Sequence, residues 1–286
     1  MDLYSQAKYI EIDGVKLCYS DTGNSEHVIV FLHGMGSNLK AWRKNISYLS
    51  QHHRCIAIDF PGYGRSEKGQ GKSDVRQSAR LIEGIITKLS LSNVTLVGHS
   101  MGGLISVLVA NSCPSKIDNI VLVAPAGVEE FSSGEIEVIK TYFTGELIAS
   151  YSKQMITKNF ELNFYDMPDD ARFMIKERHE LARDVPAFRL FCDTVSESTL
   201  SIVNNNIKNI IQELELPIIL FFGENDRLIP HHIMHPDRTT LEIAEATDKI
   251  MKNGQLIFYK KCGHFIQWEK SEEVNNHISK LITVSS

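Results

Sequence analysis

The chain contains 286 residues, of which 43% are hydrophobic and 23% are charged, and its formal net charge is −5 at pH 7. This profile excludes a disordered or fibrous protein and fits one globular α/β domain of ordinary size. The Lys and Arg residues are scattered along an acidic chain. Because nucleic-acid binding requires a clustered basic surface, the sequence argues against a nucleic-acid partner.

Six short apolar runs are predicted to form buried strands. Each run is bounded by glycine or polar turn residues and is rich in Val, Ile, Leu and Phe. The absence of polar alternation is typical of a mostly parallel sheet that is covered on both faces. In chain order the runs span residues 28–32, 56–58, 94–97, 120–124, 218–222 and 256–259.

Helical patterns separate these runs. Apolar residues recur at three- and four-residue steps over residues 74–89. Residues 271–282 carry one apolar face, with Ser271 as the expected N-cap. Strands that alternate with helices in this way predict a doubly wound α/β sheet.

The alternation stops after Pro125 and resumes at Pro217. The stretch between these prolines is helical in pattern and rich in aromatic residues. We therefore predict a helical cap at residues 128–211, inserted into a core made of residues 1–127 and 212–286. A continuous core whose middle is helical is the alternative.

A strand–turn–helix motif indicates a nucleophile. The predicted strand 94–97 leads into Gly98-His99-Ser100-Met101-Gly102, and an apolar helical pattern follows at residues 104–109. Glycines suit a turn too tight for side chains, and a serine held there in a strained conformation projects its hydroxyl above the sheet. The helix N-terminus would face a developing oxyanion. Ser100 is the predicted nucleophile.

A serine nucleophile needs a base and an acid that orients the base. Asp226 follows the predicted strand 218–222, and His264 follows the predicted strand 256–259. Ligand sites in doubly wound sheets form at these carboxyl ends of strands. We predict His264 as the base and Asp226 as its acid, with Glu224 as the rival acid.

An oxyanion also needs hydrogen-bond donors. The candidates are the backbone N–H of Met101 and that of Met35, in the loop after the first predicted strand. Gly34 lets this backbone approach a substrate closely, and we expect Gly34 and His99 to contact the substrate. His33 is expected to brace the loop and to take no part in the chemistry.

These motifs, in this order, resemble those of the α/β-hydrolase family, and the resemblance covers nearly the whole chain. The chain looks most like the helical-capped branch that contains small esterases, meta-cleavage-product hydrolases, epoxide hydrolases, dehalogenases and cofactor-free haloperoxidases. The matching residues are His33-Gly34-Met35-Gly36, Asp59-Phe60-Pro61-Gly62-Tyr63-Gly64-Arg65-Ser66, the turn at Ser100, Asp226, and Gly263-His264-Phe265.

The resemblance also implies a reaction class. Epoxide hydrolases and haloalkane dehalogenases use Asp where this chain has Ser100, which excludes those activities. Carbon–carbon bond hydrolases usually carry Asn where this chain has His99, together with a cap arginine that binds the substrate carboxylate. The cap arginines considered for that role are Arg172, Arg183 and Arg189.

The resemblance therefore implies a hydrolase that forms an acyl-enzyme with a small, largely apolar ester, as carboxylesterases and monoacylglycerol lipases do. A carbon–carbon bond hydrolase of a vinylogous 1,5-diketone is the alternative. A small-molecule receptor with a hydrolase fold is an alternative of another class.

This chemistry requires no cofactor or metal. A loop with His231, His232 and His235 is interpreted as a surface or pocket-rim loop, because it lacks an acidic ligand at helical spacing. The odd number of widely spaced cysteines predicts reduced thiols in a cytoplasmic protein. The first ten residues lack a secretory-signal pattern, and no apolar run approaches the ~20 residues that span a bilayer. The cysteines are Cys18, Cys55, Cys113, Cys192 and Cys262.

Overall fold

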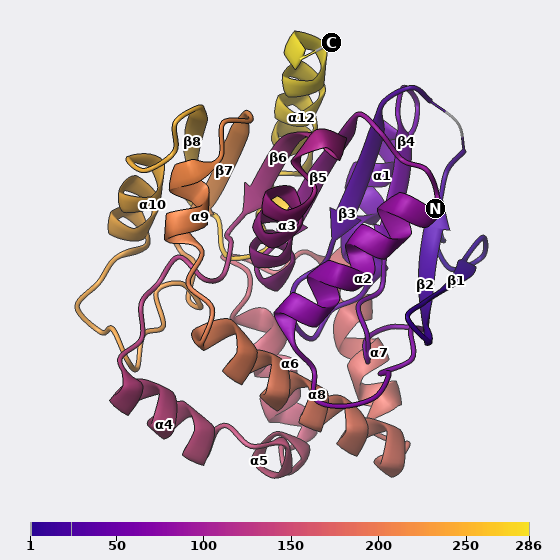
Figure 1. Cartoon of the computed structure of the whole chain (residues 1–286). Coiled ribbons are helices and arrows are strands. Elements are labelled where there is room, and N and C mark those ends of the chain that lie inside the picture. The colour runs from indigo at the N-terminus through magenta and orange to yellow at the C-terminus, as the bar shows by residue number, and fades with distance from the viewer. Residues whose placement is uncertain (1, 24, 286) are drawn as a thin grey trace.

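The computed structural model describes residues 2–23 and 25–285. Within these residues, eight strands form one sheet in the order β1-β2-β4-β3-β5-β6-β7-β8 (Figure 1). β2 pairs antiparallel with β1 and β4, and every other neighbouring pair is parallel. The predicted doubly wound α/β architecture is therefore confirmed. The strands are β1 Lys8–Ile12, β2 Val15–Asp21, β3 Val28–Leu32, β4 Arg54–Ile58, β5 Val94–His99, β6 Ile117–Val123, β7 Ile218–Gly223 and β8 Gly254–Tyr259.

The N-terminal hairpin of β1 and β2 was not among the predicted strands. Its two-residue turn consists of Asp13 and Gly14, with φ angles of 49° and 75°. An Asp-Gly pair with two positive φ values is a strong hairpin signal. The prediction missed it because β1 at the sheet edge is partly exposed and does not form a continuous apolar run.

Helices cover both faces of the sheet. α2 and α3 lie on one face and contact each other, while α1 and α12 lie on the other (Figure 1). The side chain of Asp74 caps α2 by accepting hydrogen bonds from two backbone N–H groups. These helices are α1 Arg43–Leu49, α2 Val75–Lys88, α3 Met101–Ser112, α10 Thr240–Asp248, α11 Ile266–Glu269 and α12 Ser271–Ser285, with 3-10 turns η1 Leu39–Trp42 and η2 Pro114–Lys116.

Helices are the only regular elements among the described residues between β6 and β7, and α4 to α8 lie beyond the carboxyl ends of the strands (Figure 1). Phe188, Phe191 and Val195 of α8 belong to the same hydrophobic cluster as the sheet. The division into a core and a separate cap at residues 128–211 stays a prediction. The elements are α4 Ser133–Tyr142, α5 Gly145–Ala149, α6 Lys153–Glu161, η3 Asp169–Ala171, α7 Phe173–Leu181, α8 Val185–Val203 and α9 Lys208–Glu213.

No helix of the described residues combines the length and the apolar character that crossing a bilayer requires.

Candidate active site

The predicted triad residues lie at one edge of the sheet, because each follows a parallel strand. Ser100 comes directly after β5, Asp226 lies in the loop after β7, and His264 lies in the loop after β8. β6 separates β5 from β7 in the sheet. The carboxyl ends of parallel strands meet at one edge, which is where ligands bind in this class of fold.

His264 and Asp226 are joined by a hydrogen bond of 2.7 Å between Nδ1 and Oδ2, and both side chains are buried. An ionised carboxylate only accepts hydrogen bonds, so Nδ1 of His264 carries the proton and Nε2 is left as the basic nitrogen. The other oxygen of Asp226 accepts hydrogen bonds from the N–H groups of Leu228 at 2.8 Å and Ile229 at 3.1 Å. These contacts fix the carboxylate. The rival acid, Glu224, is exposed.

Ser100 occupies a strained turn. Its φ and ψ angles are 52° and −117°. The positive φ lies in the half of the backbone map that residues other than glycine avoid. Its N–H donates to the carbonyl oxygen of Val123 at 2.9 Å, and its own carbonyl accepts the N–H of Ala126 at 3.0 Å. The residue remains half-buried. The hydrogen bonds to the end of β6 stabilise the strained turn and leave Ser100 partly accessible.

The glycines around Ser100 are required by close backbone packing. A Cβ on Gly98 would lie 2.3 Å from the carbonyl oxygen of Gly102, and one on Gly102 would lie 2.2 Å from that of Leu32. Both contacts are with backbone atoms, which cannot rotate away. The turn therefore excludes side chains at these two positions.

We expect Gly102→Ala to lower the free energy of unfolding by ~1–3 kcal/mol, the usual cost of overpacking. The matched control is Gly134→Ala in α4, where a Cβ would meet no atom within 4 Å. This control is expected to be neutral or stabilising, because alanine favours a helix over glycine by ~1 kcal/mol. Urea denaturation midpoints would measure both. Equal midpoints for the two variants would contradict the packing argument.

The loop after β3 packs directly on this turn. A Cβ on Gly34 would lie 2.7 Å from Nδ1 of His99 and 3.3 Å from Cβ of Ser100. His33 braces the loop, because its ring contacts the Gly34 carbonyl oxygen through Nδ1 at 2.7 Å and accepts the Phe60 N–H through Nε2 at 3.1 Å. Burial lowers the pKa of His33 to about 4 and keeps this ring neutral. The predicted oxyanion loop thus lies against the predicted nucleophile.

The two methionines of the predicted oxyanion hole belong to different elements near Ser100. Met101 is the first residue of α3, and the N–H groups that begin a helix have no acceptor within it. Met35 is half-buried in the loop after β3, and its sulfur accepts a hydrogen bond from the Thr199 hydroxyl at 3.2 Å. That hydrogen bond ties the loop to α8. The roles of both N–H groups stay predictions.

His99 lies beneath the His264 loop. Its Nε2 is 3.1 Å from the carbonyl oxygen of His264, and its ring centroid is 4.7 Å from that of His264 and 4.6 Å from that of Phe265. The acceptor is a carbonyl, so Nε2 carries the proton, and burial holds the pKa of His99 well below its usual range. This neutral, buried ring supports the His264 loop, and the expected contact of His99 with substrate stays a prediction.

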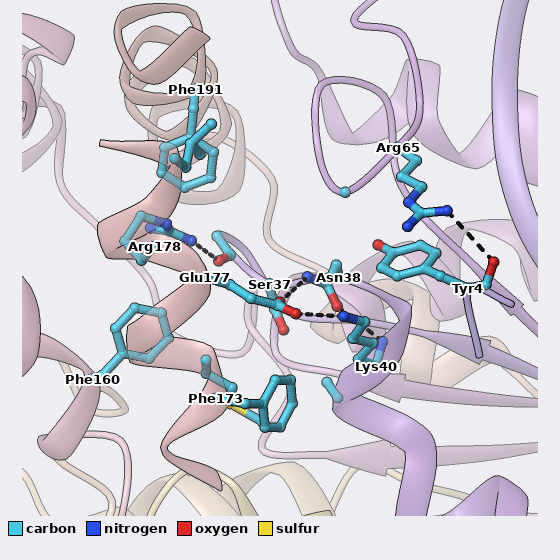
Figure 2. A pocket seen from close by; sticks show the side chains of 15 residues that line it. Tyr4, Ser37, Asn38, Lys40, Arg65, Phe160, Phe173, Glu177, Arg178 and Phe191 are labelled. Atoms are coloured by element: carbon cyan, nitrogen blue, oxygen red, sulfur yellow. Dashed lines mark hydrogen bonds and ion pairs between the residues drawn. The ribbon is translucent and has the colours of Figure 1, made fainter. Parts of the chain in front are cut away.

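A cavity of about 290 Å³ adjoins the oxyanion loop at Gly36 (Figure 2). Arg178 of α7 enters it, and its guanidinium lies 3.8 Å from the ring centroid of Phe191 and donates to the carbonyl oxygen of Gly36. Among the described residues no carboxylate lies within ion-pair distance of this arginine. Burial lowers the pKa of Arg178 to about 10, so it remains charged at neutral pH. The cavity therefore presents an unpaired cation.

Sequence reasoning missed Arg178 and considered three other arginines instead. Arg172 and Arg189 form ion pairs on the surface with side chains 54% and 50% exposed, and Arg183 is also exposed. Arg178 lies four residues after Met174 and three after Ile175, the two buried residues of α7. This helical spacing was the signal that placed it on the inner face.

The histidine-rich loop after β7 joins the start of the helical segment. Nδ1 of His235 lies 2.8 Å from Oε1 of Glu129, which also accepts the backbone N–H of His231 at 2.9 Å. Nε2 of His235 lies 3.4 Å from a carboxylate oxygen of Glu135 near the start of α4. Among the described residues, no three or more His, Cys, Asp or Glu side chains are arranged to hold a metal ion. Contacts with the Glu129 and Glu135 carboxylates thus join the loop to the start of the helical segment.

The sheet order, and the residues gathered at its carboxyl edge, are those of the α/β-hydrolase class. A family model described as alpha/beta hydrolase fold matches residues 27–271. The chain belongs to the α/β-hydrolase family, and the protein is a hydrolase.

Proteins similar to this chain in sequence or in fold carry the names of different hydrolases. The chain is 26% identical to the 2-hydroxy-6-oxononadienedioate/2-hydroxy-6-oxononatrienedioate hydrolase 1 of Pseudomonas putida, over 97% of this chain and 96% of that protein. An esterase from Exiguobacterium antarcticum shares the fold with a TM-score of 0.78 and 20% identity, over 97% of this chain and 98% of that one. The meta-cleavage product hydrolase of Pseudomonas fluorescens IP01 does so with a TM-score of 0.76 and 20% identity, over 98% of each chain.

Proposed function

We propose that the protein is a serine hydrolase that cleaves a carbon–carbon bond in a vinylogous 1,5-diketone bearing a carboxylate. Ser100 is the nucleophile, His264 the base and Asp226 the acid that orients it. The 2.7 Å hydrogen bond between His264 and Asp226 supports this triad. The observation that carries the substrate class is the half-buried Arg178 beside the predicted oxyanion loop, which has no ion-pair partner among the described residues.

The reaction proceeds through an acyl-enzyme. Nε2 of His264 takes the proton of Ser100 while the serine oxygen attacks the substrate carbonyl carbon. The backbone N–H groups of Met101 and Met35 stabilise the oxyanion, and one such donor is worth ~3 kcal/mol. The carbon–carbon bond then breaks, its electron pair passes into the conjugated ketone, and His264 returns the proton to that fragment. Water, activated by His264, releases the acyl group as a carboxylic acid.

The electrostatics of the cavity favour an anionic substrate. A partly buried charge without an ionic partner is costly, and a carboxylate offers the planar pair of acceptors that a guanidinium binds best. Arg178 already donates to the Gly36 carbonyl, so a carboxylate bound there would lie against the loop that carries Met35. Relatives named as hydrolases of 2-hydroxy-6-oxo dienoates or dienedioates agree with this choice. These names support the alternative that the sequence had placed second to ester hydrolysis.

We expect Arg178→Gln to lower kcat/KM for a 2-hydroxy-6-oxo dienoate by ~10- to 100-fold, because a hydrogen bond to a charged group is worth ~1.5–3 kcal/mol. Hydrolysis of neutral p-nitrophenyl acetate is expected to change by no more than about twofold, since no carboxylate is bound. Arg178→Lys should retain more diketone activity than Arg178→Gln, because it keeps the charge. Loss of diketone absorbance and release of p-nitrophenol measure the two reactions.

The matched control is Arg183→Gln, which removes an exposed arginine from the same helical segment. It is expected to match the wild type on both substrates. Equal losses on both substrates in Arg178→Gln would reject the carboxylate assignment. A wild-type enzyme that hydrolyses esters but leaves the diketone intact would reject carbon–carbon cleavage.

Ester hydrolysis is the second candidate, and His99 is the residue that favours it. Carbon–carbon bond hydrolases of this family usually have Asn at that position, whereas His before the serine resembles esterases. The same triad and oxyanion donors serve both reactions, because both begin with attack on a carbonyl carbon. Comparing p-nitrophenyl esters of increasing chain length with the diketone acid discriminates between the two.

A further inference from the structure

The loop that carries His264 is hydrogen-bonded to the helical segment between β6 and β7. The carbonyl oxygen of Asn163, just after α6, accepts the N–H of His264 at 2.8 Å and the N–H of Phe265 at 3.0 Å. Asn163 begins a short stretch, residues 163–166, that we call the docking segment. This segment supplies the acceptor for the backbone N–H of the predicted base itself.

Glu269, at the end of α11, joins the same two parts of the chain. Its Oε2 accepts the N–H of Gly263 at 2.7 Å, and its Oε1 accepts the N–H groups of Tyr165 at 3.0 Å and Asp166 at 3.3 Å. No described Lys, Arg or His lies within ion-pair distance of this carboxylate. Its hydrogen bonds go to backbone N–H groups on both sides, and Oε2 also accepts the thiol of Cys262 in the His264 loop at 3.9 Å.

Apolar packing reinforces these hydrogen bonds. The ring of Phe164 stacks on that of Phe265 with centroids 5.0 Å apart, and both rings are buried. A Cβ on Gly263 would lie 2.6 Å from the backbone nitrogen of Tyr165, so the two backbones are in direct contact. Phe164, Phe265 and Trp268 belong to a hydrophobic cluster distinct from the one around the sheet. The docking segment and the base loop thus share a small core of their own.

We propose that the docking segment and Glu269 position His264 for catalysis, which makes Glu269 a positioning residue. The acceptors for three consecutive N–H groups, those of Gly263, His264 and Phe265, come from Asn163 and Glu269. The imidazole's placement relative to Ser100 therefore depends on the helical segment as well as on the sheet. The inference rests on the proposed function only in taking His264 as the base and Ser100 as the nucleophile, and it holds for ester and diketone substrates alike.

The test is Glu269→Gln, which keeps the size of the side chain but replaces one accepting oxygen by an NH2 group. That NH2 group would face backbone N–H donors, either at Gly263 or at the docking segment. We expect kcat, and the rate of phosphonylation of Ser100 by a fluorophosphonate, to fall by at least about tenfold while KM changes little, because small misplacements of reacting groups cost ~10²-fold. The downfield proton NMR signal of the His264–Asp226 hydrogen bond should also shift or disappear.

The matched control is Glu272→Gln, three residues along on α12, where the glutamate is exposed. It should match the wild type in rate and NMR signal. If Glu269→Gln does not fold, Phe164→Leu decides the matter, because it removes the ring stack and leaves the carboxylate contacts in place. We expect that variant to lose rate in the same direction while retaining its circular dichroism spectrum.

Two failures are distinguishable. No phosphonylation of Ser100 in the wild type overturns the proposed function. Normal wild-type labelling, with an unchanged rate and NMR signal in Glu269→Gln, overturns the positioning role, even if the variant unfolds at a lower urea concentration. If Phe164→Leu has to be used in place of Glu269→Gln, an unchanged rate in Phe164→Leu also overturns the positioning role.

Discussion

Ser100→Ala is expected to abolish hydrolysis, with kcat lower by ~10⁶-fold, as removal of the nucleophile of a serine triad does elsewhere. The physical reason is that no other group can form the acyl-enzyme at the turn after β5. Alanine is smaller than serine and lacks only the hydroxyl, so the strained backbone and its hydrogen bonds to Val123 and Ala126 remain. The stability of the variant should therefore stay close to that of the wild type.

A fluorophosphonate probe measures this prediction without knowledge of the substrate. The wild type should gain one phosphonyl group at Ser100, as read by intact mass and peptide mapping, and Ser100→Ala should gain none. Ser92→Ala is the matched control, because it removes an exposed serine from the loop that enters β5. Equal labelling of Ser100→Ala and the wild type would refute the assignment of the nucleophile.

Asp226→Asn is expected to lower kcat by ~10⁴-fold through the tautomer of His264. A carboxylate accepts the Nδ1 proton of the imidazole, whereas an amide that donates its own N–H to Nδ1 moves the proton to Nε2. The nitrogen that should take the proton of Ser100 is then already protonated. The amide oxygen can still accept the N–H groups of Leu228 and Ile229, so the loop should keep its shape.

Glu224→Gln is the control for the acid, since it changes a second carboxylate in the same loop. Glu224 is exposed, while Asp226 contacts His264, so we expect Glu224→Gln to retain wild-type turnover. Steady-state kinetics and the rate of phosphonylation measure both variants. A silent Asp226→Asn with an impaired Glu224→Gln would transfer the role of acid to Glu224.

The parallel part of the sheet was predictable because its strands are buried on both faces. Runs such as residues 28–32 and 218–222 consist of apolar residues throughout, and each became a strand. The antiparallel β1 was missed because three of its five residues are exposed, although the Asp13-Gly14 turn indicates a hairpin. A strand buried on both faces has a continuous apolar run in the sequence, whereas a partly exposed strand has no such run.

The contacts of the base loop were beyond sequence reasoning. Asn163 and Glu269 are 106 residues apart along the chain. Both accept N–H groups around His264 only because the helical segment folds over the carboxyl edge of the sheet. No local pattern indicates these contacts, since every donor in them is a backbone N–H, a group that nearly all residues possess.

The sequence by itself determined the α/β class and the place of Ser100, because a tight glycine turn between a strand and a helix is a local requirement of the backbone. It also placed Asp226 and His264 after strands whose ends meet at one edge. Only the tertiary structure decided that Asp226, and not Glu224, contacts His264. It also decided that Arg178, and not Arg172, Arg183 or Arg189, lines the cavity beside the predicted oxyanion loop. The physical reason is that side-chain burial and pairing depend on packing between distant segments. The distance between two residues along the chain does not tell whether packing brings them into contact.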